Sequence, residues 1–394
     1  MKNDLKIFTE NIEPDAINQI YNLIVTPPFQ GQSVRIMPDV HYGKGCVVGF
    51  TSTFSDKLIP NVLGVDLGCG MLTVELGNID VDLESLDEFI KARIPAGSKY
   101  GKESAEAHFI KNMHCYPYLR DMERLLGSLG TLGGGNHFIE IDTDENGCKY
   151  LIIHSGSRNL GLQVAKHYQK MAFDSCKDSA RLEREAVVAK LNAEGRPDLI
   201  PAAIAEVNAK YAHKTKIPAE YCYLEGAQMQ MYLDDLRLCQ RFATLSRRKM
   251  ADEIIKHLKI HGTLPSFETV HNFIDTDNII RKGAIPAHEG QTVLIPMNMR
   301  DGCIIAVGKG NPEWNCSAPH GAGRICKRSE AKELFTVEEF RNEMKGIYTT
   351  TANQSTIDES PMAYKPMQEI VDLISPTVDI IRIIKPIYNF KSAE

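Results

Sequence analysis

Short apolar segments separated by glycine-containing turns are the feature that most restricts how this chain can fold. Between residues 32 and 75, segments such as Ser33–Met37 and Cys46–Phe50 are joined by turns rich in Asp, Asn, Gly and Pro. Apolar runs of this length, bounded by turn residues, favour β-strands over helices. The region therefore predicts a sheet whose connecting loops carry functional residues.

Helical patterns alternate with further strands along the rest of the chain. We expect a short helix near residues 119–126, strands at 138–141 and 149–153, and a long helix over 225–258, where apolar residues recur at three- and four-residue spacing. Residues 162–212 are rich in Ala, Glu, Lys and Arg and are interrupted by Pro197 and Pro201, which indicates a helical insertion, assigned to residues 162–220. This order predicts an α/β or α+β fold.

Composition excludes several classes of protein. The 394 residues, 43% of them hydrophobic, can bury a substantial core as one elaborate domain or as two or three smaller ones. No apolar run approaches the roughly 18 residues that a membrane span requires, and no export signal is recognised near the N-terminus. Ten scattered cysteines without a CxxC pair favour reduced thiols and a cytoplasmic location.

The charge balance gives no bulk attraction for nucleic acid. The formal net charge is -6, so any phosphate binding must come from local clusters of basic residues. Three such clusters exist: Arg247, Arg248 and Lys249; Arg324, Lys327 and Arg328; Arg382 and Lys385.

Five potential metal ligands recur in one context, at the end of an apolar segment beside small residues. Asp66 and Cys69 are three residues apart across a glycine turn, His137 and His154 adjoin predicted strands, and His271 follows the segment Glu268–Val270. Each histidine alone is more often an imidazole hydrogen-bonded to backbone than a ligand, and Cys69 alone is more often a small buried apolar residue. Together they could hold two ions bridged by the thiolate and polarise phosphoryl oxygens, if the fold brings them together.

Two further segments have the composition of phosphate-binding loops. Ser155–Arg158 (SGSR) offers hydroxyls, backbone N–H groups and a guanidinium, although an ordinary polar turn explains it as well. Ser317–Arg324 (SAPHGAGR) places His320 before a glycine pair, where its ring could approach a phosphorus atom as a nucleophile must. If a helix starts there, Arg324 and Arg328 follow one and two turns onward.

Seven blocks in order give the chain a resemblance to the RtcB family of RNA ligases. The resemblance runs from about residue 33 to the C-terminus and implies one large domain, residues 1–394, with mixed sheets around a di-metal centre. The blocks are Met37–Gly45 (MPDVHYGKG), Gly64–Met71 (GVDLGCGM), Gly130–Phe138 (GTLGGGNHF), His154–Arg158 (HSGSR), Arg281–Ala284 (RKGA), His320–Arg324 (HGAGR) and Pro361–Lys365 (PMAYK).

The resemblance implies a set of site residues and cofactors. His320 would take GMP from GTP, two Mn²⁺ ions would bind Asp66, Cys69, His137, His154 and His271, and Arg158, Arg324 and Arg328 would face RNA phosphates. The RNA would carry a 3′-phosphate or 2′,3′-cyclic phosphate on one end and a 5′-hydroxyl on the other, and the enzyme is expected to be a monomer. The implied GTP contacts are Asn136, His137, Phe138, Ile139, Glu140, Asn272, Pro296, Met297, Asn298, Met299, Cys303, Gly321, Ala322, Gly323, Tyr364 and Lys391.

The chain departs from the family pattern at the implied nucleotide pocket. Pro296–Arg300 reads PMNMR where members commonly show PGSMG, and Cys303 stands where a serine is usual. Pro319 before the nucleophile and His288 are also unusual, which suggests a paralogous branch whose RNA substrate differs from tRNA halves.

Two other functions are compatible with these residues. A metal-dependent phosphodiesterase that only opens 2′,3′-cyclic phosphates needs the metal ligands but not His320. A non-catalytic RNA-binding subunit needs neither, so retention of all six residues argues against it.

Overall fold

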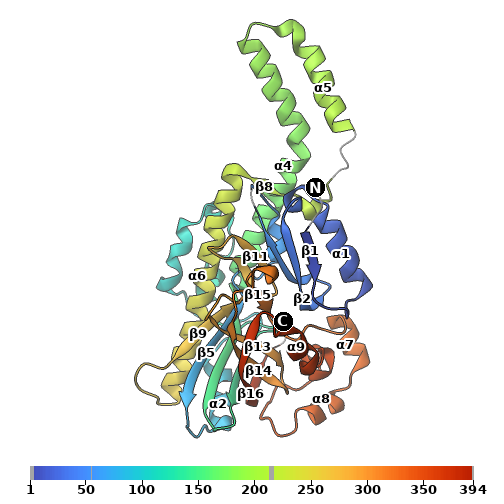
Figure 1. Cartoon of the computed structure of the whole chain (residues 1–394). Coiled ribbons are helices and arrows are strands. Elements are labelled where there is room, and N and C mark those ends of the chain that lie inside the picture. The colour runs from blue at the N-terminus through green and yellow to red at the C-terminus, as the bar shows by residue number, and fades with distance from the viewer. Residues whose placement is uncertain (1–3, 55, 213–216, 393–394) are drawn as a thin grey trace.

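The computed structural model describes residues 4–54, 56–212 and 217–392, and sheets and helices alternate along it (Figure 1). The helices are α1 Pro14–Ile24, α2 Leu83–Arg93, α3 Met122–Gly127, α4 Arg158–Ala193, α5 Ile200–Ala212, α6 Gly226–His257, α7 Arg328–Leu334, α8 Val337–Glu343 and α9 Met367–Ile374. The strands are β1 Asp4–Ile7, β2 Ser33–His41, β3 Val48–Thr53, β4 Lys57–Leu58, β5 Gly70–Gly77, β6 Phe138–Thr143, β7 Lys149–Ser155, β8 Leu224–Glu225, β9 Ser266–Val270, β10 Asn272–Ile274, β11 Ile279–Lys282, β12 Ala284–Pro286, β13 Thr292–Asn298, β14 Gly302–Gly308, β15 Ser317–Pro319 and β16 Val378–Lys391.

Two larger sheets organise the body of the protein. One has seven strands in the order β13-β14-β16-β6-β7-β5-β9, and the other has five in the order β1-β2-β3-β11-β10. The outer strands of the seven-stranded sheet approach each other, because the Leu294 N–H of β13 donates to Thr269 Oγ1 of β9 at 3.0 Å. The sheet is therefore curled around an interior lined by side chains such as Met71, Tyr150 and Ile305.

The long helix α6 covers the outer face of the curled sheet. Met250, Ala251 and Ile254 pack in one cluster with Leu72 and Ile153 of the sheet. Nearer the start of α6, Tyr232 and Leu236 join a second cluster that extends to the five-stranded sheet. One helix therefore ties the two sheets together in a single domain of mixed helices and sheets, as the sequence predicted. The seven-stranded sheet is antiparallel throughout, and the five-stranded sheet is mixed because β1 and β2 pair in parallel.

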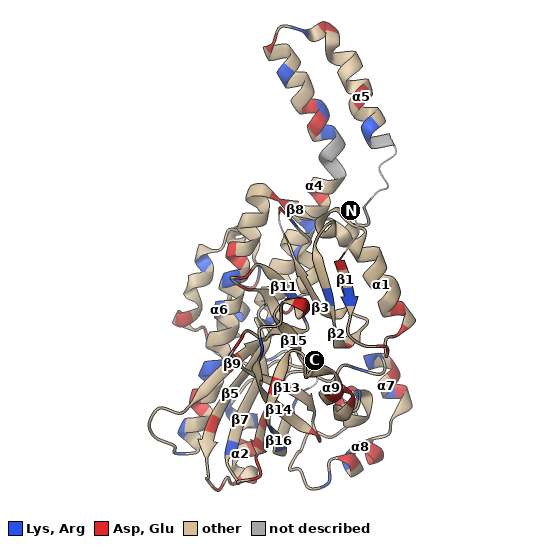
Figure 2. Cartoon of the chain, viewed as in Figure 1, with Lys and Arg blue, Asp and Glu red and all other residues tan. Residues whose placement is uncertain are grey.

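Helices α4 and α5 form a hairpin that projects from the body (Figure 1). The first part of the hairpin belongs to the body of the protein, because Leu160, Val164 and Tyr168 of α4 are buried in the core cluster shared with α6. The outer part carries both signs of charge (Figure 2), with ion pairs such as Arg181–Glu185. Of the predicted insertion, residues 162–220, positions 213–216 lie outside the described residues.

The sequence left open whether a helix starts at His320. The chain does not form a helix at His320, since the turn that follows β15 continues to Lys327 and α7 begins only at Arg328. Gly323 has φ +77°, and a β-carbon there would lie 2.4 Å from the Asp39 carbonyl oxygen. The segment is therefore held in an extended turn that only glycine permits at this close approach.

None of the helices among the described residues combines the length and the apolarity that crossing a membrane requires.

Candidate metal centre and nucleotide cavity

The five predicted metal ligands meet at one end of four neighbouring strands. Cys69 precedes β5, His137 precedes β6, His154 lies near the end of β7 and His271 follows β9. The antiparallel register places Gly70 opposite both Ser155 and Val270, and Phe138 opposite His154. Segments distant in sequence therefore deliver their ligands to the same edge of the sheet.

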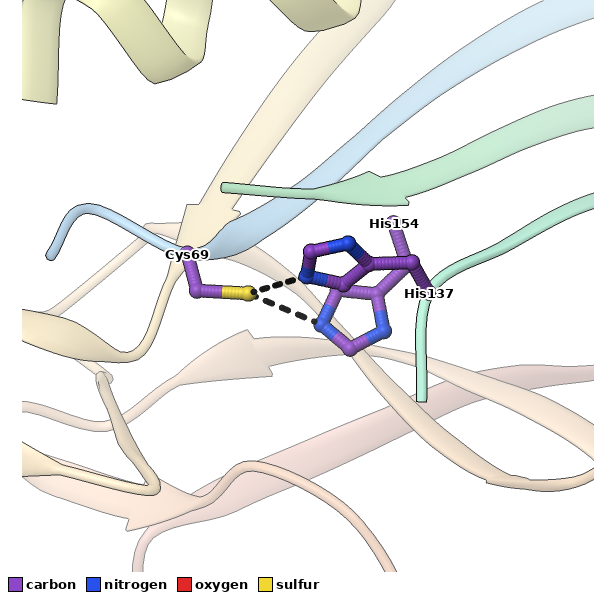
Figure 3. A group of neighbouring side chains, drawn as sticks. All are labelled: Cys69, His137 and His154. Atoms are coloured by element: carbon purple, nitrogen blue, oxygen red, sulfur yellow. Dashed lines mark hydrogen bonds between the residues drawn. The ribbon is translucent and has the colours of Figure 1, made fainter. Parts of the chain in front are cut away.

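The ligand atoms lie within contact distance of one another. Cys69 Sγ is 3.5 Å from His137 Nε2 and 3.3 Å from His154 Nε2 (Figure 3). His154 Nε2 is 3.4 Å from His271 Nε2, and His137 Nε2 is 2.8 Å from Asp66 Oδ2. The three histidines and Cys69 are buried, so this is an enclosed cluster rather than a surface patch.

The protonation pattern of this cluster fits a cation. His137 Nδ1 lies 2.8 Å from the Leu132 carbonyl and His154 Nδ1 lies 3.0 Å from the Asn136 carbonyl. Because a carbonyl only accepts, each Nδ1 carries the proton and each Nε2 turns a lone pair toward Cys69. Neither Asp66 Oδ1 nor His271 Nδ1, both buried, has a hydrogen-bond partner among the described residues. Mixed oxygen, nitrogen and sulfur donors of this kind suit a divalent transition metal.

Electrostatics agree with that assignment. Burial alone would raise the pKa of Asp66, but the neighbouring His137 lowers it to about 2. Burial lowers the pKa values of His154 and His271 well below their ordinary range. Three of the groups are thus in the form that binds metal at neutral pH. Burial and Asp66 raise the pKa of the Cys69 thiol, a shift that cation binding opposes.

Arg247 holds the two ligand loops in place. Its side chain is fully buried, and Nη1 donates to the carbonyls of Gly68 at 3.0 Å and Ser155 at 2.8 Å. These residues directly precede Cys69 and follow His154. The sequence suggested a phosphate-binding role for this basic cluster, but Arg247 instead braces the metal centre from α6.

His320 lies beside the cluster and is oriented by a buried carboxylate. Its ring centroid is 4.9 Å from that of His271. Its Nδ1 is 2.6 Å from Asp39 Oδ2, and its backbone N–H donates to the same oxygen at 3.1 Å. Asp39 is fully buried on β2, in the five-stranded sheet. Since Asp39 engages Nδ1, Nε2 is left as the ring nitrogen with a lone pair for chemistry.

A cavity with about 740 Å³ of empty space, open to solvent, lies against His320, His154 and His271. Aromatic, amide and basic side chains line it, and such a lining suits a nucleotide. Twelve of the residues expected to contact GTP line it: Asn136, Phe138, Glu140, Pro296, Met297, Asn298, Met299, Gly321, Ala322, Gly323, Tyr364 and Lys391.

Four other residues expected at this cavity lie elsewhere. His137 belongs to the metal cluster, and Asn272 lines a neighbouring cavity. Ile139 packs on the outer face of the sheet with the α6 cluster, because side chains alternate along β6. Cys303 is fully buried in the interior of the curled sheet. The structure therefore does not bring the Ile139 and Cys303 side chains to the cavity.

The substituted segment Pro296–Arg300 shapes one wall of the cavity. Met297 and Met299 line it, where the family pattern has a glycine and a methionine. The Asn298 amide donates to Asp301 Oδ2 at 2.8 Å, and its oxygen accepts from the N–H groups of Arg300 and Asp301. The Asn298 side chain therefore stabilises its own turn, and its hydrogen-bonding groups are largely engaged there.

A buried glutamate organises the basic residues at the far wall. Glu359 accepts from Lys391 Nζ at 2.8 Å and from the Tyr364 hydroxyl at 2.7 Å, and lies 2.5 Å from Arg328 Nη1. Arg324 Nη1 approaches the same carboxylate at 3.5 Å. Burial opposes ionisation, but these cations hold the pKa of Glu359 far below its usual value. The expected RNA contacts Arg324 and Arg328 are thus prepositioned by an anion.

Arg158 lies on the opposite side of the metal cluster. It is the first residue of α4, has φ 59° and donates from Nη2 to the Gly97 carbonyl at 2.8 Å. Its charge contributes to the lowered pKa of Asp66. A non-glycine residue in this left-handed conformation is strained, which is typical of functional positions.

Two acids and a thiol are buried together next to the cavity. Glu140 and Asp142 share the inner face of β6, and both lie within 4.8 Å of Cys303 Sγ of β14. Burial raises the pKa values of both carboxyls, and the charge of Asp142 raises that of Glu140 further. No described nitrogen or oxygen atom hydrogen-bonds to either carboxylate oxygen of Asp142. At neutral pH this pair opposes folding.

Several functional residues carried no assigned role in the sequence. Asp39 and His41 lie in the quoted block Met37–Gly45, and the signal was present because an acid inside an apolar strand needs a buried partner. His41 also lines the cavity, and burial lowers its pKa to about 4. Glu359 lies in a short 3₁₀ turn, Ile357–Glu359, with no pattern that marks it.

These features define a class of protein: one with a buried cluster of candidate transition-metal ligands, an adjoining open cavity and an oriented histidine between them. The family model described as tRNA-splicing ligase RtcB matches residues 19–115 and 110–392, so the chain belongs to the RtcB family. It is 29% identical to the RNA-splicing ligase RtcB of Escherichia coli K12, over 98% of this chain and 97% of that protein. It is 26% identical to the tRNA-splicing ligase RtcB of Methanococcus maripaludis, over 93% and 89%, and 25% identical to that of Archaeoglobus fulgidus, over 92% and 88%.

We predict that Cys69→Ser loses divalent metal while keeping the fold, because a serine hydroxyl is a poorer anionic ligand than a thiolate. At a hundredfold excess of Mn²⁺ over its Kd, the wild-type protein gains about 3 kcal/mol of stability, and the variant should gain less than half. Elemental analysis and thermal melts with and without Mn²⁺ measure both effects. Cys148→Ser is the matched control and should bind metal normally. Full metal content in Cys69→Ser would remove Cys69 from the site.

The buried acid pair predicts an unusual pH dependence. A raised carboxyl pKa in the folded state means that stability is lost as pH rises above the ordinary Asp value of about 4. Asp142→Asn removes this penalty, so the variant should gain about 1–3 kcal/mol over wild type at pH 8 and much less near pH 5. Urea unfolding at both pH values measures the difference. Asp144→Asn should behave oppositely, because hydrogen bonds lower the pKa of Asp144 against the effect of burial. A pH-independent difference for Asp142→Asn would contradict the argument.

Proposed function

We propose that this protein is a GTP-dependent RNA ligase that joins a 3′-phosphate or 2′,3′-cyclic phosphate end to a 5′-hydroxyl end through a guanylate linked to His320. The observation that carries the proposal is the position of His320. Its ring lines the nucleotide cavity and touches the metal cluster, and Asp39 fixes its tautomer. The RtcB relatives named as RNA-splicing or tRNA-splicing ligases support the choice of RNA as substrate.

In the first step His320 Nε2 attacks the α-phosphorus of GTP. A nitrogen–phosphorus bond forms, the bond to the bridging oxygen breaks, and pyrophosphate leaves with its electron pair. The imidazole becomes cationic as the bond forms, and the Asp39 carboxylate at 2.6 Å from Nδ1 stabilises that charge. Holding the ring by two hydrogen bonds to one oxygen also reduces the entropy lost on attack.

The cluster residues would hold two divalent ions, which we assign as Mn²⁺, through Asp66, Cys69, His137, His154 and His271, with Cys69 shared. Bound cations would supply charge neutralisation at the phosphoryl oxygens. The guanylate would occupy the cavity between Phe138 and Tyr364, with the Lys391 ammonium, 5.1 Å from the Phe138 ring centre, close to its phosphate. Glu140, whose pKa is raised by burial, offers its carboxyl group as a hydrogen-bond partner of the base.

In the second step the guanylate passes from His320 to the RNA 3′-phosphate, a cyclic end being opened first. The 5′-hydroxyl of the partner strand then attacks the activated phosphorus and displaces GMP. Arg158, Arg324 and Arg328 would bind the RNA phosphates on both sides of the cluster. Arg328 is 41% exposed and Arg324 only 10%, so Arg328 is the more accessible of that pair.

A phosphodiesterase that only opens cyclic phosphates would use the metal cluster without His320. The Asp39–His320 pair argues against it, because burying a carboxylate to fix one histidine costs stability that metal-dependent hydrolysis does not need. A binding subunit without catalysis is disfavoured by the same pair.

Substituting His320 tests the proposal. We choose His320→Asn, because its amide can still donate a hydrogen bond to buried Asp39. The variant should fold and bind metal, form no acid-labile guanylate with labelled GTP, and lose ligation by about a thousandfold or more, as expected when a covalent nucleophile is removed. It should still join an RNA whose 3′-phosphate was chemically activated with GMP. Labelling of the variant, or failure to join the activated RNA, would refute the nucleophile assignment.

Asp39→Asn tests whether Asp39 acts by orienting the His320 ring for guanylate formation. An amide that donates to Nδ1 favours the tautomer with its proton on Nε2, which has no lone pair for attack. We expect single-turnover guanylate formation to fall by about tenfold or more, while joining of GMP-activated RNA stays near the wild-type rate. An equal loss in both steps would indicate a structural role instead.

A further inference from the structure

A second cavity meets the nucleotide cavity at His320. It encloses about 1140 Å³, open to solvent, and shares His41, Asn136, His271, His320, Arg324 and Arg328 with the first. His320 therefore stands in the common wall of two spaces. Under the proposed function, the guanylate occupies the first cavity. The second cavity is then the one from which another substrate can reach the same phosphorus.

The walls of this second cavity are basic, unlike the protein as a whole. Lys282, Arg324, Lys327 and Arg328 line it, and Glu13 is the one carboxylate among its lining residues that the structure describes. The whole chain has a net charge of -6, and charged residues of both signs are spread along its helices and strands (Figure 2). Lys327 and Arg328 are 48% and 41% exposed. Lys327 Nζ is paired with Asp15 at 3.2 Å and Arg328 Nη1 with Asp358 at 2.8 Å, so the wall is partly neutralised, but its exposed N–H groups still offer donors to a phosphate.

An aromatic ring is held at the entrance to this cavity. Tyr42 lines it and is 48% exposed. Its backbone N–H donates to Glu13, and the next residue, Gly43, is fixed by Gln19 Nε2, which donates to its carbonyl at 2.7 Å. Lys327 Nζ lies 5.7 Å from the ring centre. The loop is anchored, so the ring is presented at little further entropic cost.

We propose that the second cavity holds the terminal nucleotides of the RNA and that Tyr42 is a stacking platform for a base next to the joined end. A rigid, exposed ring flanked by cations is the chemistry that binds single-stranded nucleic acid without sequence preference. The phosphates would lie along Lys327 and Arg328, and the terminal phosphate would reach His320 and the metal cluster. Stacking at this point holds the end in register for transfer.

The test is a binding cycle on the full chain. Fluorescence anisotropy measures the Kd of wild type and Tyr42→Ala for two short single-stranded RNAs with 3′-phosphates, one intact and one abasic at the last two nucleotides. Tyr42→Ala should weaken binding of the intact RNA about tenfold, in the range of one base–aromatic stack, and change binding of the abasic RNA by less than twofold. Tyr42→Phe should bind both RNAs like wild type, because the ring is kept. Tyr21→Ala, which removes another exposed tyrosine, should also leave both affinities unchanged.

The outcomes separate this inference from the proposed function. Equal weakening of both RNAs by Tyr42→Ala, or no weakening of either, overturns the stacking platform. Weakening by Tyr42→Phe equal to that by Tyr42→Ala overturns it as well, since the hydroxyl and not the ring would then matter. Guanylate labelling of the wild-type protein is measured in parallel without RNA. Its absence would refute the proposed ligase function, whereas the stacking platform is decided by the RNA affinities alone.

Discussion

The centre of this structure depends on one constraint. The ligand atoms of the candidate metal cluster turn lone pairs toward one another without protons between them. His137 and His154 are locked by backbone carbonyls into the tautomer that turns Nε2 inward, toward Cys69. Such a cluster is repulsive by itself, and a divalent cation converts it into a stabilising one. The curled sheet, the register of four strands and the brace from Arg247 all serve to keep these atoms together. Metal binding and correct strand pairing should therefore be strongly coupled.

The basic side chains around the cavity beside His320 depend on a buried counter-charge. Lys391, Arg324 and Arg328 would repel one another if they were placed there alone. Glu359 neutralises part of this charge from beneath, and it does so with a side chain that is itself buried. The basic groups are thereby prepositioned for phosphate without needing a basic protein around them. This arrangement reconciles a net charge of -6 with a polyanionic substrate.

The parts of the site that could be predicted from sequence are those encoded locally. Metal ligands at strand ends beside glycine, and a histidine before a glycine pair, can be recognised in the sequence because the residues that form each loop are neighbours along the chain. The partner of that histidine was not visible, since Asp39 is remote in sequence and meets His320 only through packing of the five-stranded sheet. Glu359 was hidden for the same reason.

Two further points depend on the structure. Whether a helix starts at His320 could not be decided from sequence, because the close contact between Gly323 and the Asp39 carbonyl is tertiary. Ile139 stays a predicted contact of the nucleotide, but the alternation of side chains along β6 turns its side chain away from the cavity that Phe138 and Glu140 line, which leaves its backbone for such a contact.

Burial of the acid pair Glu140 and Asp142 lowers the stability of the folded protein. Their strand also delivers Phe138 to the nucleotide cavity and follows His137 of the metal cluster, so β6 carries functional groups along most of its inner face. A strand used in this way cannot fill that face with apolar side chains. The cost falls on Asp142, which is buried without a hydrogen-bond donor from oxygen or nitrogen among the described residues. Cys303, small and polarisable, packs against it where a larger apolar side chain would have to be accommodated beside a carboxylate. Local conflict with good packing is expected at functional sites, and here it adjoins the carboxylate that lines the cavity.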